Sequence, residues 1–214
     1  MHTIENALRY VVLAGVFALP FIVFLVTTSL FFPFITGKNF AFRIIVEIIA
    51  AAWLALALIN VQYRPRRSWV LGLFAVFTLV VAAADAFGAV PFKSFWSNFE
   101  RMDGWVTLAH LCVYIVVAAS VLNSQKLWRR LWHTSLGVSV VIGLYGLLQL
   151  AGVQSLGQGG GAGLTARLDA TFGNPIYLAA YMLFHVFIAA MLWAQAWTDT
   201  TRSRVTVSLG YGSI

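Results

Sequence analysis

The sequence predicts an all-α fold, a polytopic bundle of about six transmembrane helices with a short interfacial helix between the third and the fourth. Of its 214 residues, 61% are hydrophobic and 10% are charged, with a mean hydropathy of +0.86. Soluble domains are about 45–50% apolar and about 25% charged. The basic residues behind the net charge of +7 lie in short clusters between apolar runs, which indicates loop signals for membrane insertion rather than nucleic-acid binding.

Six apolar runs are long enough to be membrane spans. A span needs about 20 mostly apolar residues, because the hydrocarbon core is about 30 Å thick and a helix rises about 1.5 Å per residue. The first run has a predicted kink at Pro20, and it is too long for a signal-peptide core. The predicted spans are residues 8–34, 42–60, 69–88, 105–122, 131–152 and 176–197.

Loop charge predicts the orientation of this single transmembrane domain. Nine of the 14 Lys and Arg residues lie on the side of the N-terminus and five on the other side. The positive-inside bias then predicts a cytoplasmic N-terminus. The loops after the first, third and fifth spans face outward. The residues after Arg204 look like the opening of a further segment, so we expect the N-terminal part of a longer protein.

The outer loop at residues 91–104 is predicted to contain the interfacial helix. Its large apolar residues follow the i, i+3, i+4, i+7 spacing of one helical face, and Arg101 lies on the opposite face. Such a helix lies at the membrane interface, either as a simple anchor or with Arg101 facing a headgroup or phosphate. Asp103 is the predicted N-cap of the fourth span.

The outer loop at residues 153–175 ends in strong helix-start signals. Asn174 is the predicted N-cap and Pro175 the first helical residue, so the sixth span begins on the outer side. Helix N-termini favour phosphates, and Arg167 is close enough in sequence to fold back over this one. Alternatively, Arg167 pairs with Asp169 or reaches the interface. The glycine-rich stretch 157–163 lacks the Gly-Lys-Ser/Thr of a phosphate-binding P-loop.

Two arginines and two helix N-termini are thus predicted at the same membrane level. Arg101 precedes the fourth span and Arg167 the sixth, and both spans start on the outer side. This arrangement suits an anionic, membrane-bound substrate such as a lipid pyrophosphate.

Polar residues inside the spans are few. Arg43 and Glu47 are one turn apart, and we favour an ion pair between them, the alternative being that Glu47 faces the bundle interior. His110 and His185 are predicted to be hydrogen-bonded core residues. Asp85 could serve the outer cavity, although nothing selects it. No spacing matches a metal site, and we expect neither metal nor cofactor.

Two segments resemble the O-antigen ligase and polymerase superfamily. They are SNFERMDG at residues 97–104 and TFGNP at residues 171–175, the latter followed by LAAY at residues 178–181. Ile176 departs from the second Asn that many members carry after Asn-Pro. The resemblance covers about thirty residues in motif, and both segments fall in the outer loops that the charge distribution selects.

The resemblance implies a metal-independent glycosyltransferase of cell-envelope polysaccharide synthesis, located in the bacterial inner membrane. Such proteins move a glycan from undecaprenyl pyrophosphate to lipid A core, another glycan or a protein, on the periplasmic face. It implies substrate contacts at Arg101, Arg167 and Asn174. The catalytic residues are unknown and expected beyond residue 214, so these residues alone are expected to be inactive. The alternatives are a small transporter and a non-catalytic scaffold; no nucleic-acid partner is expected.

Overall fold

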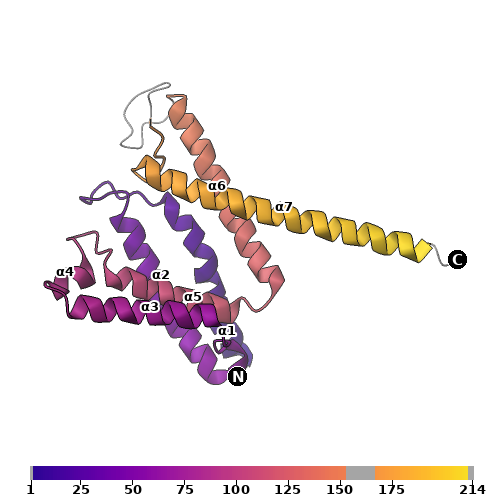
Figure 1. Ribbon diagram of the computed structural model, residues 1–214, viewed down its shortest axis with the longest axis horizontal. Helices are drawn as coiled ribbons and strands as arrows, with labels where there is room; N and C mark the ends of the chain where they lie inside the picture. The colour runs from indigo at the N-terminus through magenta and orange to yellow at the C-terminus, as the bar shows by residue number, and fades with distance from the viewer. Residues whose placement is uncertain (1, 153–166, 212–214) are drawn as a thin grey trace. The chain divides into compact units, whose positions relative to one another are not determined.

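The computed structural model describes residues 2–152 and 167–211, which are all-helical (Figure 1). Five helices are long and apolar enough to cross a membrane, and the predicted fourth span is the shorter apolar helix α5 (Trp105–Val121). The chain is therefore a multi-pass membrane protein by helix length and composition. It divides into two compact units, Met1–Leu127 and Trp128–Ile214. The stretch 157–163 lies outside the described residues.

The first unit is built around α2 (Thr36–Ile59), which packs against α1 (His2–Ala18) and α5. A fourth helix, α3 (Trp69–Ala86), packs against α5. A β-carbon on Gly15 would lie 2.2 Å from Cγ2 of Ile49, so glycine is what lets α1 approach α2 this closely. The core between these helices includes the fully or almost fully buried β-branched side chains Val12, Val16, Val46, Ile49, Val117 and Val121.

The outward helix faces carry large apolar side chains. Trp69 is 89% exposed and Leu58 is 73% exposed, and Thr78 is the buried residue of α3. A water-soluble surface does not expose apolar area on this scale. The hydrocarbon core of a membrane is itself apolar, so it can surround these side chains. The helices can lie in it because each one satisfies its own backbone hydrogen bonds.

The predicted first span is ten residues too long. The α-helix ends at Ala18 and continues as the 3-10 helix η1 (Leu19–Phe24), after which residues 25–35 form an irregular loop. Pro20 explains the change of helix type, because proline lacks an N–H and its ring clashes with the preceding turn. The loop is folded by its own hydrogen bonds, including Thr27 N–H to the Pro33 carbonyl at 2.9 Å. Hydropathy does not distinguish such an apolar loop from a helix.

Two helices begin six residues earlier than predicted. α2 begins at Thr36 rather than at residue 42, and α6 (Gln125–Leu150) begins before residue 131. In both cases basic residues that were assigned to loops lie inside the helix. In α6 the first turn follows Ser124, whose hydroxyl accepts a hydrogen bond from the Leu127 N–H at 3.3 Å.

The interfacial helix is shorter than predicted, and the last helix is longer. α4 (Pro91–Trp96) has six residues and stops where Ser97 adopts a φ of 64°. The predicted helical face as far as Met102 is therefore wrong. α7 (Pro175–Tyr211) begins where predicted but continues past residue 197 through Arg204.

In the second unit α6 and α7 contact each other through small and polar residues. The Ser135 hydroxyl lies 2.9 Å from Nε2 of His185, and a β-carbon on Gly143 would lie 3.6 Å from Cε of Met182. Ser135 and Gly143 of α6 therefore lie against α7.

Candidate anion-binding site

The loop at residues 97–104 has an unusual backbone. Ser97, Glu100 and Met102 all adopt positive φ angles, of 64°, 64° and 47°. Each such conformation costs about 1–3 kcal/mol in a residue other than glycine, and persists only where the surroundings impose it. Gly104 closes the loop in a space that excludes a side chain, because a β-carbon there would lie 2.5 Å from the Phe95 carbonyl oxygen. The loop is thus held in one conformation.

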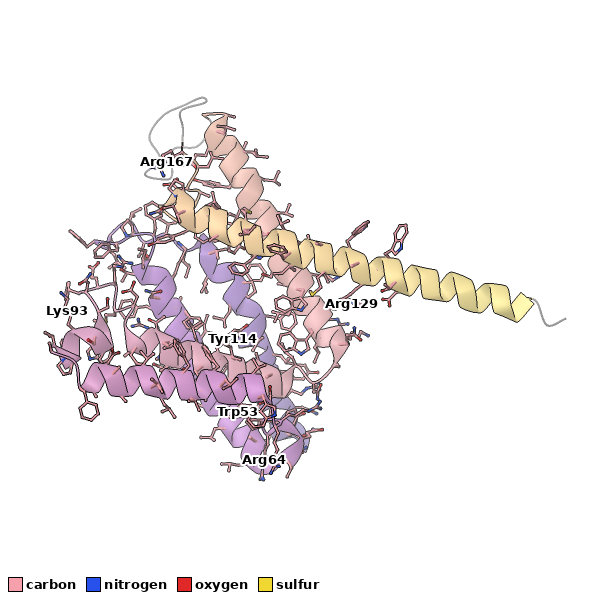
Figure 2. The ribbon with its side chains drawn as sticks, in the orientation of Figure 1. Trp53, Arg64, Lys93, Tyr114, Arg129 and Arg167 are labelled. Atoms are coloured by element: carbon pink, nitrogen blue, oxygen red, sulfur yellow. The ribbon has the colours of Figure 1, made fainter. Side chains whose placement is uncertain are left out.

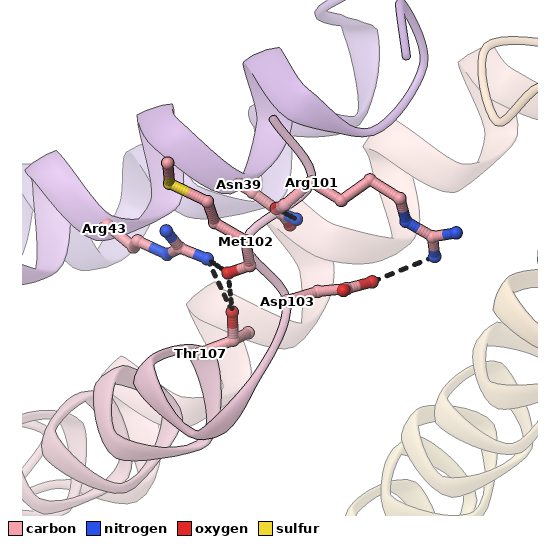
Figure 3. A network of polar contacts seen from close by, with 6 residues as sticks. All are labelled: Asn39, Arg43, Arg101, Met102, Asp103 and Thr107. Carbon is pink, nitrogen blue, oxygen red and sulfur yellow. Dashed lines mark hydrogen bonds and ion pairs between the residues drawn. The ribbon is translucent and has the colours of Figure 1, made fainter. Parts of the chain in front are cut away.

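Two side chains of α2 fix the backbone of this loop (Figure 3). Asn39 donates a hydrogen bond to the Arg101 carbonyl at 3.0 Å. Arg43, one turn later and only 6% exposed, donates to the Met102 carbonyl and to the Thr107 hydroxyl, the latter at 2.8 Å. Asn39 and Arg43 therefore hold two consecutive carbonyl groups of the loop.

Glu100 ties the same loop to the irregular segment before α2. Its Oε2 accepts hydrogen bonds from the backbone N–H groups of Phe31 at 2.8 Å and Phe32 at 3.3 Å. These are backbone donors that no helix or strand would otherwise satisfy. Glu100 therefore has a structural role, which argues against it as a catalytic base.

The Arg101 side chain is held by two contacts, but one of its hydrogen-bond donors has no partner among the described residues. Its Nη2 lies 2.9 Å from Oδ2 of Asp103, and its guanidinium lies 5.6 Å from the centre of the Phe32 ring. Its Nε is buried and has no hydrogen-bond partner among the described residues. The Arg101 side chain as a whole is 29% exposed, so it is partly accessible beside the aromatic ring.

Asp103 is a partner of Arg101 rather than a helix cap. Gly104 occupies the N-cap position of α5 without a side-chain hydrogen bond, so the predicted Asp103 cap is wrong. Partial burial by itself would raise the pKa of Asp103. Hydrogen bonds from Ser97 and Arg101, together with the Arg101 charge, outweigh the effect of burial and hold the pKa below its usual value. Asp103 is thus kept ionised beside Arg101.

The start of α7 has the predicted geometry. The Asn174 side chain accepts a hydrogen bond from the Ile176 N–H at 2.9 Å, and Pro175 is the first helical residue. The prediction of an Asn174 cap is confirmed. A helix N-terminus carries a partial positive charge, so this end of α7 favours an anion.

The turn before α7 is held by a buried side-chain pair. Gln149 of α6 donates to Oδ1 of Asp169 at 2.7 Å and accepts from the Ala170 N–H at 3.0 Å. Asp169 is fully buried, whereas Arg167 is exposed, at the end of the second unit where α7 begins (Figure 2). The alternative pairing of Arg167 with Asp169 stays a prediction, because Asp169 has contacts beyond those described.

The structure groups the predicted substrate contacts by unit. Arg101 belongs to the first unit, and Arg167 and Asn174 belong to the second. The favoured ion pair of Arg43 with Glu47 does not form, since Arg43 turns to the loop and Glu47 contacts His110 at 3.3 Å. Both histidines are hydrogen-bonded as predicted, each through Nδ1 to the carbonyl four residues earlier; His185 is buried, whereas His110 is only partly buried.

Sequence reasoning missed Asn39, Arg43 and Gln149 as supports of the two motifs. The i, i+4 spacing of Asn39 and Arg43 would have placed both on one helical face, had residues 36–41 been assigned to the helix. Over the described residues, no three His, Cys, Asp or Glu side chains converge as metal ligands would.

Comparison of the chain with protein-family models, with curated proteins and with solved structures finds no match.

Proposed function

We propose that this multi-pass membrane protein is the donor-binding part of a membrane glycosyltransferase that uses undecaprenyl-pyrophosphate-linked glycans. An acceptor hydroxyl on a lipid, a glycan or a protein attacks the anomeric carbon. The bond from that carbon to the pyrophosphate oxygen then breaks. Each unit offers its own candidate contacts for a pyrophosphate, whose charge increases as the bond breaks: Arg101 in the first unit, and Arg167 with the start of α7 at Asn174 in the second.

The observation that carries the proposal is the fixed conformation of loop 97–104. Three non-glycine residues with positive φ are held by Asn39, Arg43 and Glu100. Strain of this kind is typical of sites that must present a group in a set position. The group presented here is the Arg101 guanidinium, with a buried donor that has no partner among the described residues.

The proposal is tested with the purified protein made from the complete reading frame. Incubated with a glycan linked to undecaprenyl pyrophosphate and with a suitable acceptor, it is expected to yield glycosylated acceptor and free undecaprenyl pyrophosphate in equal amounts. Neither metal nor nucleotide is added. Release of the pyrophosphate without acceptor modification, or no reaction with any of the three acceptor classes, would contradict the proposal.

The proposal requires loops 91–104 and 153–175 to face the periplasm, which cysteine labelling checks. In a Cys112→Ser background, Phe99→Cys and Gly160→Cys are expected to react with an impermeant thiol reagent added to intact cells. Arg66→Cys, in the basic connection before α3, is expected to react only after the membrane is opened. The reverse pattern would place both motifs in the cytoplasm and remove the periplasmic assignment.

One observation favours a transporter as the second candidate. Glu47 of α2 contacts His110 of α5 with its own side chain 68% exposed, and ionisable pairs on apolar helices mark ion or substrate routes. The transfer assay separates the candidates when it is performed in sealed vesicles. A transporter would move the glycan lipid or an ion across the membrane without forming glycosylated acceptor.

A further inference from the structure

Four arginines belong to the end of the first unit where α1 begins and α2 ends. Arg9 lies in the first half of α1, and Arg64, Arg66 and Arg67 lie in the connection between α2 and α3. Figure 2 shows Arg64 at this end of the unit. The acidic residue in the first turn of α1 is Glu5. The excess of positive charge favours an anionic ligand at this end.

The packing of α1 against α2 brings Arg9 to the same end. The Glu5 carboxylate accepts a hydrogen bond from the Asn60 side chain at 2.9 Å, whereas Gly15 meets Ile49, so the two helices are antiparallel. Interpolation between these two contacts places Arg9 beside the last two turns of α2. Helical side chains lean towards the N-terminus of their own helix, so the Arg9 side chain leans towards the basic end.

Arg9 has a buried hydrogen-bond donor that the described residues leave without a partner. Its Nε is buried and makes no hydrogen bond to residues 2–152 or 167–211. Glu5, one turn earlier, does not form an ion pair with it and instead accepts hydrogen bonds from Asn60 and, at 3.4 Å, from Gln62. A buried charged donor without an acceptor is costly. An acceptor oxygen from a ligand would remove this cost.

The connection that carries the other arginines is held in a set position. The Trp53 indole donates a hydrogen bond to the Tyr63 carbonyl at 2.9 Å, at the end of the 3-10 helix η2 (Val61–Tyr63). The next residue, Arg64, donates from Nε to the Ala57 carbonyl at 3.1 Å, in the last turn of α2. Its two terminal nitrogens have no partner in the part of the chain that the structure describes. They remain available as donors beside the end of α2.

Exposed apolar side chains border these arginines. Leu58 and Val61, at the end of α2 and the start of η2, are 73% and 67% exposed, and Ile4 in the first turn of α1 is 61% exposed. A free anion gains nothing from such neighbours. A phospholipid does, because its phosphate can reach the arginines while its acyl chains cover the apolar side chains.

We propose that this end of the first unit binds the headgroup of an anionic phospholipid, whose phosphate accepts hydrogen bonds from Arg9 and Arg64. Arg66 and Arg67 add attraction for the negative charge of the headgroup. The lipid site lies at the opposite end of α2 from loop 97–104, which Asn39 and Arg43 hold. Lipid binding therefore does not depend on the proposed glycan transfer, and either can fail without the other.

Native mass spectrometry of the purified protein made from the complete reading frame tests the proposal. The quantity measured is the dissociation constant of the first bound phosphatidylglycerol, with phosphatidylcholine as the uncharged comparison. We expect phosphatidylglycerol to bind about tenfold more tightly than phosphatidylcholine. Arg9→Met is expected to weaken phosphatidylglycerol binding about tenfold, the scale of one charge-assisted hydrogen bond, and to leave phosphatidylcholine binding unchanged.

Two further variants keep the result independent of folding defects. Arg9→Lys keeps the charge but not the Nε donor, so it is expected to bind phosphatidylglycerol with an affinity between those of Arg9→Met and the unmodified protein. Arg64→Gln is expected to weaken binding in the same direction. Because both arginines contact one phosphate, the loss in the double variant Arg9→Met with Arg64→Gln is expected to be smaller than the product of the separate losses.

Arg130→Met is the matched control, because Arg130 is an exposed arginine of the second unit. It is expected to bind phosphatidylglycerol as the unmodified protein does. Equal losses in Arg9→Met and Arg130→Met, or unchanged binding in Arg9→Met, would overturn the proposal. Independent losses at Arg9 and Arg64 would contradict a shared phosphate. Displacement of phosphatidylglycerol by an equal concentration of inorganic phosphate, at constant ionic strength, would show that the site takes a free anion rather than a lipid.

Discussion

Replacing Arg167 with alanine in the protein made from the complete reading frame lowers glycan transfer by about 100-fold or more, the size of effect seen when one charge-stabilising group is removed from a transition state. Arg167 is exposed before the start of α7. Under the proposed function, its guanidinium binds the pyrophosphate. Arg167→Lys recovers only part of the activity, because a lysine cannot make two parallel hydrogen bonds to a phosphate.

The measurement is the initial rate of acceptor glycosylation, compared at equal amounts of protein in the membrane. Arg66→Ala is the matched control, since Arg66 is also exposed but lies in the connection before α3. It is expected to have the rate of the unmodified protein. Unchanged transfer in Arg167→Ala would remove Arg167 from the proposed site, whereas equal losses in both variants would indicate a general effect of surface charge.

The second large effect is expected on stability, from Gln149→Met. Methionine is close to glutamine in size but cannot bond to Asp169 or to the Ala170 N–H. Both of these groups are buried, so they lose hydrogen bonds that water does not replace. The expected loss is about 3 kcal/mol in the free energy of unfolding, the scale for removing a partner from a buried polar pair.

Denaturant unfolding in detergent, followed by helix content, measures this change. Leu147→Ala is the control, because Leu147 is on the same helix two residues earlier and is 59% exposed. We expect that variant to change stability by much less than Gln149→Met. If the two variants lose the same free energy, the Gln149 hydrogen bonds are not what holds the turn before α7.

The helix beginnings that local chemistry determines could be predicted from the sequence. Asn174 and Pro175 set the start of α7, and the structure has the predicted start and cap. The starts of α3 and α5 at Trp69 and Trp105 were also placed correctly. The end of the first span was not, because the apolar residues after Phe24 fold into a loop that hydropathy cannot distinguish from a helix.

The supports of the candidate site could not be predicted, because they join residues far apart in the chain. Arg101 was recognised in its loop, yet the α2 side chain that holds its carbonyl, Asn39, is 62 residues away in sequence. Arg43 was assigned a neighbour on its own helix, since local spacing offers Glu47 first. Because α2 packs against α5, Arg43 instead donates a hydrogen bond to the Met102 carbonyl, and the Glu47 carboxylate contacts the ring of His110.

The buried position of Arg43 has a consequence for how the protein is made. Its acceptor Met102 is synthesised 59 residues later, which at about 5–20 residues per second is an interval of about 3–12 s. During that interval α2 must enter the membrane with a guanidinium that lacks its final acceptors. Arg43 is in the first half of α2, so its long side chain can reach towards the headgroups. The arginine therefore begins as a surface group and leaves the aqueous boundary only when α5 arrives beside it.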